Sequence, residues 1–191
     1  QETGFYDPVK GTKIDNLRFS KVLIPKLRDI YSQEELENLV VMGPDAGGGP
    51  RAQHYAKQLG TEVAHAYKKR SYNHANHVEE LRVLGDFKDR NVFVIDDMID
   101  TGGSICKLVD KLKEEGAKDV KVGATHLLLN KNAIRNLSDL EIEIIGSDSI
   151  PRNDEFFTKN PNFIQIPHAS LYARAIYNLN HNASLEPVYE G

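Results

Sequence analysis

The stretch VFVIDDMIDTGGS, residues 92–104, runs from four apolar residues into two adjacent carboxylates and then into a turn of small residues. A strand followed by such a turn and a helix start makes an anion site, because free backbone N–H groups and the positive end of the helix dipole converge there. Asp96, Asp97 and Asp100 would repel a bare phosphate, so we expect their carboxylates to face hydroxyl groups or a divalent cation. A sugar joined to a phosphate satisfies both halves of the motif. The alternative is a purely structural turn in which an Asp caps the helix.

A second stretch, VVMGPDAGGGPRA at residues 40–52, has the same plan of apolar strand, glycine-rich turn with one carboxylate, and helix. Two strand ends of one parallel sheet, each with exposed N–H groups, could hold two phosphate-bearing groups side by side. Asp45 would then be placed for a metal ion. The alternative is a structural loop in which the glycines at 47–49 serve tight backbone geometry.

Three consecutive cations, from Lys68 to Arg70, open a polar segment that we expect to be a mobile loop ending at Val78. Such a cluster is often solvated surface. The functional interpretation is that Lys68 and Arg70 close over transferring phosphates and neutralise charge as it develops. His74 and His77 are interpreted as exposed loop histidines, because two histidines alone make a poor metal site.

Strand-like apolar runs alternate along the chain with segments of helical period, which predicts βαβ units. The clearest helix carries Ile105, Leu108, Val109 and Leu112 on one face. We expect strands at 39–43, 62–67, 92–95, 120–126, 142–147 and 163–166, and helices at 17–31, 50–59, 104–115, 131–137 and 169–180. The predicted fold class is α/β, with a mostly parallel central sheet flanked by helices.

The composition is that of an ordinary soluble domain, with 191 residues, 40% hydrophobic and 27% charged, and a net charge of −4. One domain is the default at this length. The negative charge gives no general attraction to nucleic acid or to an anionic membrane, and no apolar run approaches the roughly 18 residues of a membrane span. The single cysteine, Cys106, excludes an internal disulfide and favours the cytoplasm. We therefore expect neither a nucleic-acid nor a membrane partner.

Taken together, these stretches resemble the C-terminal half of the ribose-phosphate pyrophosphokinase family, whose members have the type I phosphoribosyltransferase fold. The resemblance covers nearly the whole chain, from GFYDP at residues 4–8 through VVMGPDAGG and VFVIDDMIDTGGS to ATH at 124–126 and SIP at 149–151. The combination of DDMIDTGGS with a following ATH is its most specific part, because a generic phosphoribosyltransferase would share only the first.

The resemblance implies a role for each stretch. It implies that Asp96 and Asp97 contact ribose hydroxyls or their metal ion. The residues implied to wrap the 5-phosphate of ribose 5-phosphate are Asp100, Thr101, Gly102, Gly103 and Ser104. The implied pyrophosphate loop consists of Asp45, Ala46, Gly47 and Gly48. The implied catalytic cations are Lys68 and Arg70, and the implied Mg²⁺ ligands are Asp45, Asp7 and Asp15.

The implied reaction transfers the pyrophosphoryl group of MgATP to the C1 hydroxyl of ribose 5-phosphate, giving phosphoribosyl pyrophosphate and AMP. The resemblance also implies a homo-oligomer, since members of the family are built from dimers and form hexamers. They consist of two similar domains, and their ATP-binding residues precede the point at which this chain begins. We therefore expect residues 1–191 to form a single phosphoribosyltransferase-like domain, the ribose 5-phosphate-binding half, with an N-terminal ATP-binding half missing.

Two other functions stay open. A phosphoribosyltransferase that uses phosphoribosyl pyrophosphate and a nucleobase would need a pocket for the base, and residues 1–39 offer no obvious aromatic or acidic one. A non-catalytic subunit associated with an active synthetase would be expected to lose loop cations or motif carboxylates, whereas this chain retains both.

Overall fold

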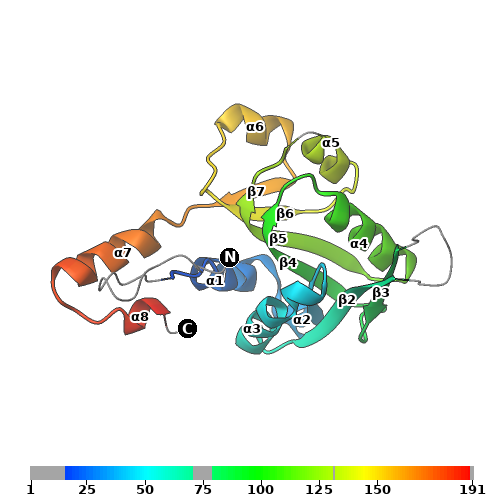
Figure 1. Cartoon of the computed structure of the whole chain (residues 1–191), viewed down its shortest axis with the longest axis horizontal. Helices are drawn as coiled ribbons and strands as arrows, with labels where there is room; N and C mark the ends of the chain where they lie inside the picture. The colour runs from blue at the N-terminus through cyan, green and yellow to red at the C-terminus, as the bar shows by residue number, and fades with distance from the viewer. Residues whose placement is uncertain (1–15, 71–78, 131, 190–191) are drawn as a thin grey trace.

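The computed structural model describes residues 16–70, 79–130 and 132–189. A seven-stranded sheet in the order β3-β2-β1-β4-β5-β6-β7 forms its centre (Figure 1). Neighbouring strands are parallel except β3, which pairs antiparallel with β2. The strands are β1 Leu39–Gly43, β2 Glu62–Arg70, β3 Glu79–Leu84, β4 Asn91–Ile99, β5 Asp119–Leu127, β6 Ile144–Ser147 and β7 Phe163–Ile166. The predicted α/β fold with a mostly parallel sheet is confirmed.

Helices cover both faces of this sheet (Figure 1). The apolar residues of α4 and α5 join Val92 and Val94 of β4 in one buried cluster. Those of α1 and α3 join Phe93 and Ile95 in a second cluster on the opposite face. The helices are α1 Ser20–Ile30, α2 Gln33–Glu37, the 3-10 turn η2 Ala46–Gly48, α3 Gly49–Leu59, α4 Gly103–Glu114, α5 Ala133–Ser138, α6 Asp154–Lys159, α7 Ala169–Asn180 and α8 Glu186–Tyr189.

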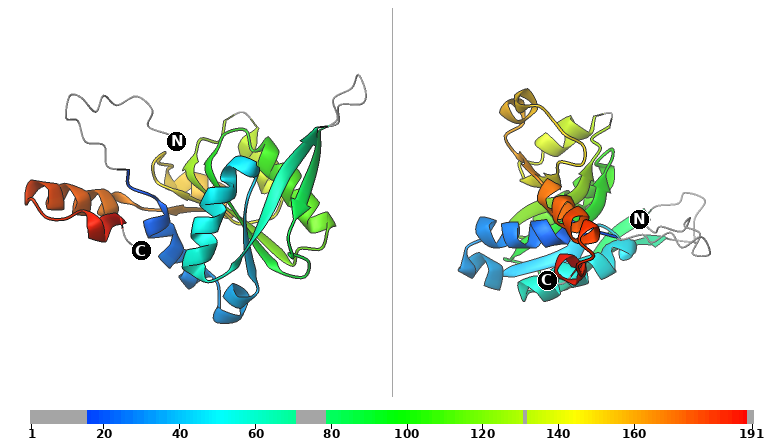
Figure 2. Two further views of the ribbon diagram at one scale, coloured as in Figure 1. Left: turned by 60° about the horizontal axis from the view of Figure 1, so that its bottom comes forward. Right: turned by 90° about the vertical axis from the view of Figure 1, so that its left-hand side faces the viewer.

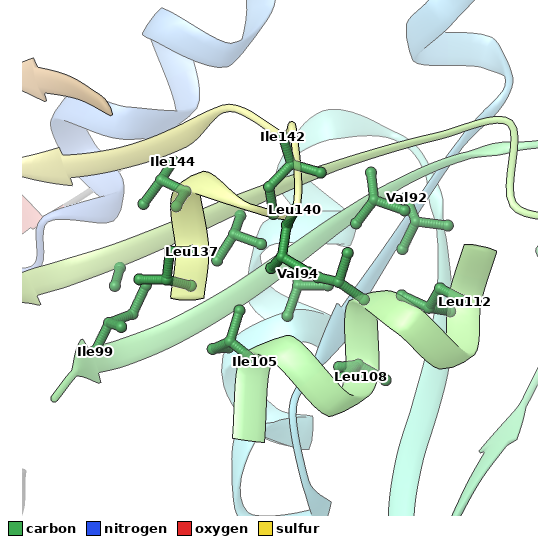
Figure 3. Packing of buried hydrophobic residues seen from close by; sticks show 14 of the residues in the cluster. Val92, Val94, Ile99, Ile105, Leu108, Leu112, Leu137, Leu140, Ile142 and Ile144 are labelled. Atoms are coloured by element: carbon green, nitrogen blue, oxygen red, sulfur yellow. The ribbon is translucent and has the colours of Figure 1, made fainter. Parts of the chain in front are cut away.

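Helix α4 has the apolar stripe that its sequence predicts. Ile105, Leu108, Val109 and Leu112 are all buried, and Figure 3 shows this helix packed along β4. The helix and the strand are joined by the turn of the DDMIDTGGS motif, so the packing that fixes them relative to each other also fixes the ends of that turn.

Three strands are longer than predicted: β5 by one residue at each end, and β4 and β2 by several residues. β4 continues past Ile95 to Ile99, so Asp96 and Asp97 lie within a strand and not in the turn after it. β2 continues to Arg70, and the prediction that Lys68 and Arg70 belong to a loop is wrong for their backbone. The physical reason is the hairpin with β3, which supplies a hydrogen-bonding partner strand for this polar end of β2. The rest of the predicted loop, 71–78, lies outside the described residues.

Several elements were not predicted. β3 lies at the sheet edge and alternates in polarity, with Leu81 and Val83 packed against the buried cluster. Helices α2, α6 and α8 are all short; α2 is held at its start by a capping box in which Ser32 and Glu35 bond each other's backbone N–H groups. Helix α1 begins at Ser20, three residues later than predicted, and Pro25 lies inside it.

Helix α7 extends away from the sheet, and α8 folds back beside it (Figures 1 and 2). Ala175 of α7 is buried, whereas the large apolar side chains of Ile176, Tyr177 and Leu179 are exposed. Within the described ranges, no helix combines the length and the apolar character that crossing a membrane requires.

We predict that Gly123 of β5 is required to make room for Phe93 of β4. A Cβ at Gly123 would lie 2.4 Å from Cζ of Phe93, whose side chain is fully buried. Gly123→Ala should therefore lower the free energy of unfolding by about 1–3 kcal/mol through overpacking. Urea denaturation should also show that Gly123→Ala lowers the free energy of unfolding by less in a Phe93→Leu background, because the aromatic ring that the new Cβ would meet is absent. Additive effects of the two substitutions would contradict this explanation.

Candidate active site

The two turns that were predicted to form the site lie side by side at the carboxyl edge of the sheet, because β1 and β4 are parallel neighbours. The register pairs Met42 with Val94, and β1 ends one residue later at Gly43, whereas β4 runs on. The glycine-rich turn that follows β1 is therefore placed beside Asp96 and Asp97 of β4.

The glycine-rich turn folds back tightly onto the end of β1. A Cβ at Gly43 would lie 2.7 Å from the backbone of Gly48, so a side chain at Gly43 cannot be accommodated without moving the turn. Asp45 caps the turn, since its Oδ1 accepts the N–H of Gly48 at 3.1 Å. The tight backbone geometry that the structural alternative expects of this turn is therefore present at Gly48. Asp45 is also exposed, and its role as a metal ligand stays a prediction.

Arg51, in the first turn of α3, binds both carboxylates of the acidic pair. Its Nη1 donates to Oδ1 of Asp96 at 3.1 Å, and its Nη2 lies 3.3 Å from Oδ2 of Asp97. Backbone N–H groups of the strand end hold the same carboxylates, since Asp97 donates to Oδ1 of Asp96 and Met98 to Oδ1 of Asp97, each at 2.8 Å. Arg51 is not among the site residues predicted from sequence.

The strand that carries the acidic pair is irregular at this point. Val92 and Val94 face the same buried cluster as Ile99, so the alternation of faces shifts by one residue between them. The register with β5 pairs Asp96 with Ala124 and then Met98 with His126, leaving Asp97 without a pairing position. In a regular strand consecutive side chains point to opposite faces. At this point of the strand both carboxylates, although consecutive, contact the guanidinium of Arg51.

The two carboxylates have different proton affinities. Burial, with the nearby negative charge of Asp97 adding to it, raises the pKa of Asp96 to about 6. Burial acts in the same direction on Asp97, but Arg51, the Asp96 side chain and the N–H of Met98 together hold the pKa of Asp97 below its usual range. Near neutral pH the pair carries close to two negative charges, and Arg51 neutralises one of them.

The turn between β4 and α4 is tight, and its role in binding phosphate stays a prediction. Gly102 adopts φ +75° at the N-cap of α4, and a Cβ there would lie 3.2 Å from Leu137. Asp100 links the turn to Asn130, whose Nδ2–H donates to its Oδ1 at 2.6 Å. The first four N–H groups of a helix have no intrahelical partner, so those that open α4 are available to an anion. The exposed hydroxyl-bearing residues are Thr101 and Ser104.

The predicted catalytic cations lie on β2, two strands away from β4 in the sheet. The last residue of β1 pairs with His65, and β2 runs five residues further, so Lys68 lies about 10 Å beyond the end of β1 along the strand. Lys68 is exposed. The structure does not bring it into contact with the acidic pair. The side chain of Arg70 lies outside the described part of the chain. The same is true of the whole of His74, His77, Asp7 and Asp15.

Acidic and histidine side chains do not form a closed metal cage: within the described residues, no group of three or more His, Cys, Asp or Glu could hold a metal ion. Mg²⁺ commonly takes one or two carboxylates and completes its shell with water and substrate oxygens. The adjacent carboxylates of Asp96 and Asp97, already compensated by a cation, fit that kind of site.

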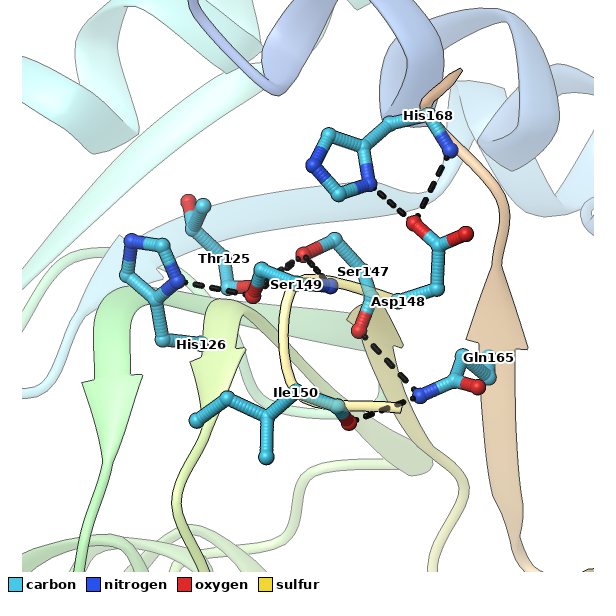
Figure 4. Close-up of polar contacts among 8 residues, drawn as sticks. All are labelled: Thr125, His126, Ser147, Asp148, Ser149, Ile150, Gln165 and His168. Carbon is cyan, nitrogen blue, oxygen red and sulfur yellow. Dashed lines mark hydrogen bonds and ion pairs between the residues drawn. The ribbon is translucent and has the colours of Figure 1, made fainter. Parts of the chain in front are cut away.

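A further polar network lies at the same edge of the sheet, where β5 and β6 end (Figure 4). Ser149 Oγ lies 2.8 Å from Nδ1 of His126, and Ser147 Oγ donates to the backbone carbonyl of Thr125 at 2.5 Å. Beside it, Asp148 accepts the backbone N–H of His168 at 3.1 Å and contacts Nδ1 of the same residue. His126 and Ser149 belong to the ATH and SIP motifs, to which the sequence analysis assigned no role.

A parallel sheet whose carboxyl edge combines an acidic pair, a glycine-rich turn and a helix N-terminus is typical of α/β proteins that bind phosphorylated ligands at strand ends. Comparison with known families narrows this class. The model of the phosphoribosyl transferase domain matches residues 14–156, and the chain belongs to that family.

The individual proteins to which this chain is similar indicate a particular enzyme within that family. Ribose-phosphate pyrophosphokinase of Helicobacter pylori is 35% identical over 190 residues, which are 99% of this chain and 55% of that protein. The enzyme of the same name from Haemophilus influenzae is 36% identical over 191 residues, 99% of this chain and 58% of that protein. The crystal structure of phosphoribosylpyrophosphate synthetase from Mycobacterium smegmatis superposes with a TM-score of 0.74 at 32% identity, covering 87% of this chain and 52% of that one. The chain thus spans little more than half the length of the curated relatives it matches.

We predict that Asp96→Asn stabilises the fold. At pH 7 the free energy of unfolding should rise by the order of 1 kcal/mol after allowance for solvent screening, because a buried charge is removed while Asp97 keeps Arg51 paired. The native pKa of about 6 lies above the ordinary value of 3.8, so the wild type loses stability as the pH rises from about 4 to about 6, and the variant does not.

Urea denaturation at pH 4 and pH 7 tests this prediction. The difference in free energy of unfolding between Asp96→Asn and the wild type should be small at pH 4 and should reach its full size above pH 6. Asp110→Asn is the matched control, since Asp110 is an exposed carboxylate on α4 and should change stability by less than about 0.5 kcal/mol. A variant less stable than the wild type at pH 7 would mean that Asp96 is a net stabilising charge.

Proposed function

We propose that this chain is the ribose 5-phosphate-binding part of a ribose-phosphate diphosphokinase. The reaction transfers the pyrophosphoryl group of MgATP to the C1 hydroxyl of ribose 5-phosphate and gives phosphoribosyl pyrophosphate and AMP. The observation that carries the proposal is identity of 35–36% to ribose-phosphate pyrophosphokinases over 99% of this chain, a span that includes both turns at the sheet edge.

The geometry of the edge supports the assignment of roles. The turn from Asp100 to Ser104 would hold the 5-phosphate on the N–H groups that open α4. Asp96 and Asp97 would accept the ribose hydroxyls, and the turn from Asp45 to Gly48 would receive the pyrophosphoryl group. These two turns lie side by side because β1 and β4 pair in parallel, which is the arrangement that an in-line transfer between two bound phosphorylated groups needs.

Phosphoryl-type transfer asks the protein mainly for positioning and charge neutralisation. Lys68 and Arg70 would supply the positive charge for the transition state. Mg²⁺, when bound, would neutralise phosphate oxygens, and Asp45, Asp96 and Asp97 are the described carboxylates that could hold it, with Asp7 and Asp15 proposed from sequence. No covalent nucleophile is required, and Cys106, half-buried on α4, is assigned a packing role.

The remaining expectations belong to the same proposal. ATP is the co-substrate, the complete protein is a homo-oligomer of cytoplasmic location, and neither nucleic acid nor membrane is a partner. The ATP-binding residues would come from sequence that this chain does not contain.

The family match alone is also consistent with a phosphoribosyltransferase that consumes phosphoribosyl pyrophosphate and a nucleobase. The products separate the two: AMP from ATP and ribose 5-phosphate in one case, pyrophosphate release with a base in the other. A non-catalytic subunit would co-purify with an active partner and have no turnover of its own.

We predict that Lys68→Ala or Arg70→Ala in the complete gene product lowers kcat for AMP formation by about 10²–10³-fold, because a transition-state cation is removed. Binding of ribose 5-phosphate, measured by calorimetry, should stay within about twofold of the wild type. Lys57→Ala, which removes an exposed cation from the far end of α3, is the matched control and should leave both quantities unchanged. Equal loss of turnover and of ribose 5-phosphate binding would show that these cations are not specific to the transfer step.

A further inference from the structure

The contact between Arg51 and the acidic pair joins the two turns of the candidate active site. Arg51 follows directly after the glycine-rich turn, and Asp96 and Asp97 precede the phosphate cradle. The guanidinium lies across the gap between them, with one nitrogen on each carboxylate, at 3.1 and 3.3 Å. It therefore occupies carboxylate oxygens that the proposed function assigns to ribose hydroxyls and to Mg²⁺.

The backbone on both sides of this contact is held in place. The turn before Arg51 is fixed by the close approach of Gly43 and Gly48 and by the cap from Asp45, and helix α3 packs through Ala52 and Tyr55 in the buried cluster. On the other side, strand backbone N–H groups hold the carboxylates. The freedom in this contact thus lies in the long side chain of Arg51, which is 29% exposed.

The charges favour an exchange of one cation for another. Two adjacent, partly buried carboxylates repel each other, and a guanidinium that bridges them removes most of that repulsion. A divalent cation that binds Oδ1 of Asp96 or Oδ2 of Asp97 would have to displace the guanidinium from that oxygen. A cation entering with a phosphorylated sugar also brings anionic groups, which give the displaced guanidinium a new partner at the neighbouring turn.

We propose that Arg51 is a positioning residue that binds the carboxylates of Asp96 and Asp97 until substrate arrives. The divalent cation then binds poorly by itself and binds well together with the sugar phosphate. This rests on the part of the proposed function that gives the acidic pair a cation and a sugar phosphate. By linkage, ribose 5-phosphate then raises cation affinity, and cation raises ribose 5-phosphate affinity by the same factor.

The test is a titration with Mn²⁺ as the probe, in which free Mn²⁺ is measured by electron paramagnetic resonance with and without ribose 5-phosphate. Arg51→Gln should bind Mn²⁺ alone about tenfold more tightly than the wild type, because a competing charge next to the site is gone. Arg51→Lys should lie between the two, since lysine keeps the charge and loses the two-pronged contact. The enhancement of Mn²⁺ affinity by ribose 5-phosphate should be smaller in Arg51→Gln than in the wild type.

Controls locate the effect. Arg135→Gln removes an exposed cation from α5 and should leave Mn²⁺ affinity unchanged, and Asp97→Asn added to Arg51→Gln should abolish the gain. Thermal denaturation checks that each variant is folded. Mn²⁺ binding to Arg51→Gln that is equal to or weaker than that of the wild type overturns the inference, as does a gain that survives Asp97→Asn.

The same titration separates this inference from the proposed function. If the wild type binds ribose 5-phosphate but the wild type and Arg51→Gln bind Mn²⁺ with equal affinity, the role proposed for Arg51 is wrong and the proposed function stands. If ribose 5-phosphate has no effect on any protein while Arg51→Gln still binds Mn²⁺ more tightly, the competition between Arg51 and the cation stands and the assigned substrate is wrong.

Discussion

The burial of strand β4 on both faces is the constraint on which the site depends. Val92 and Val94 are enclosed by one helical layer, and Phe93 and Ile95 by the other. A shift of one residue in this strand would exchange the two sets of side chains between two differently shaped clusters, so the register is strongly determined. The acidic pair follows directly after these four residues, and its position in space is therefore set by apolar packing that takes no part in the chemistry.

A second consequence of that packing is electrostatic. Carboxylates at the end of a strand buried on both faces lose part of their hydration, and the protein compensates with a cation from the neighbouring helix and with backbone N–H groups of the strand itself. Asp96 remains the less favourable of the two charges, as its raised pKa indicates. If Asp96 binds ligand as proposed, stability and binding make opposite demands on this side chain.

The sequence predicted the parts of the structure that follow from local pattern. The stripe of Ile105, Leu108, Val109 and Leu112 predicted α4, and continuous apolar runs predicted β1 and β7 with the bounds observed. The extension of β4 was missed because adjacent aspartates are unfavourable in strands, and here a pairing strand overrides that preference.

Local sequence patterns could not predict the contacts of Arg51 and Asn130, for a different reason. Arg51 meets a partner 45 positions away and Asn130 one 30 positions away, and neither residue stands out by type or spacing. Only the pairing of distant strands brings them to the site. Catalytic roles for Lys68 and Arg70, and metal binding by Asp7, Asp15 and Asp45, stay predictions.

The two edges of the sheet have a bearing on how the protein behaves in a crowded solution. A long, flat and apolar edge strand offers unpaired backbone groups to a second chain. Here one edge is β3, on which Arg82 and Glu80 form an ion pair at 3.0 Å, and the other is β7, which is four residues long. The charges on β3 and the short length of β7 make it unfavourable for a second copy of the chain to add a strand at either edge. These two edge strands therefore protect the sheet from aggregation through strand pairing.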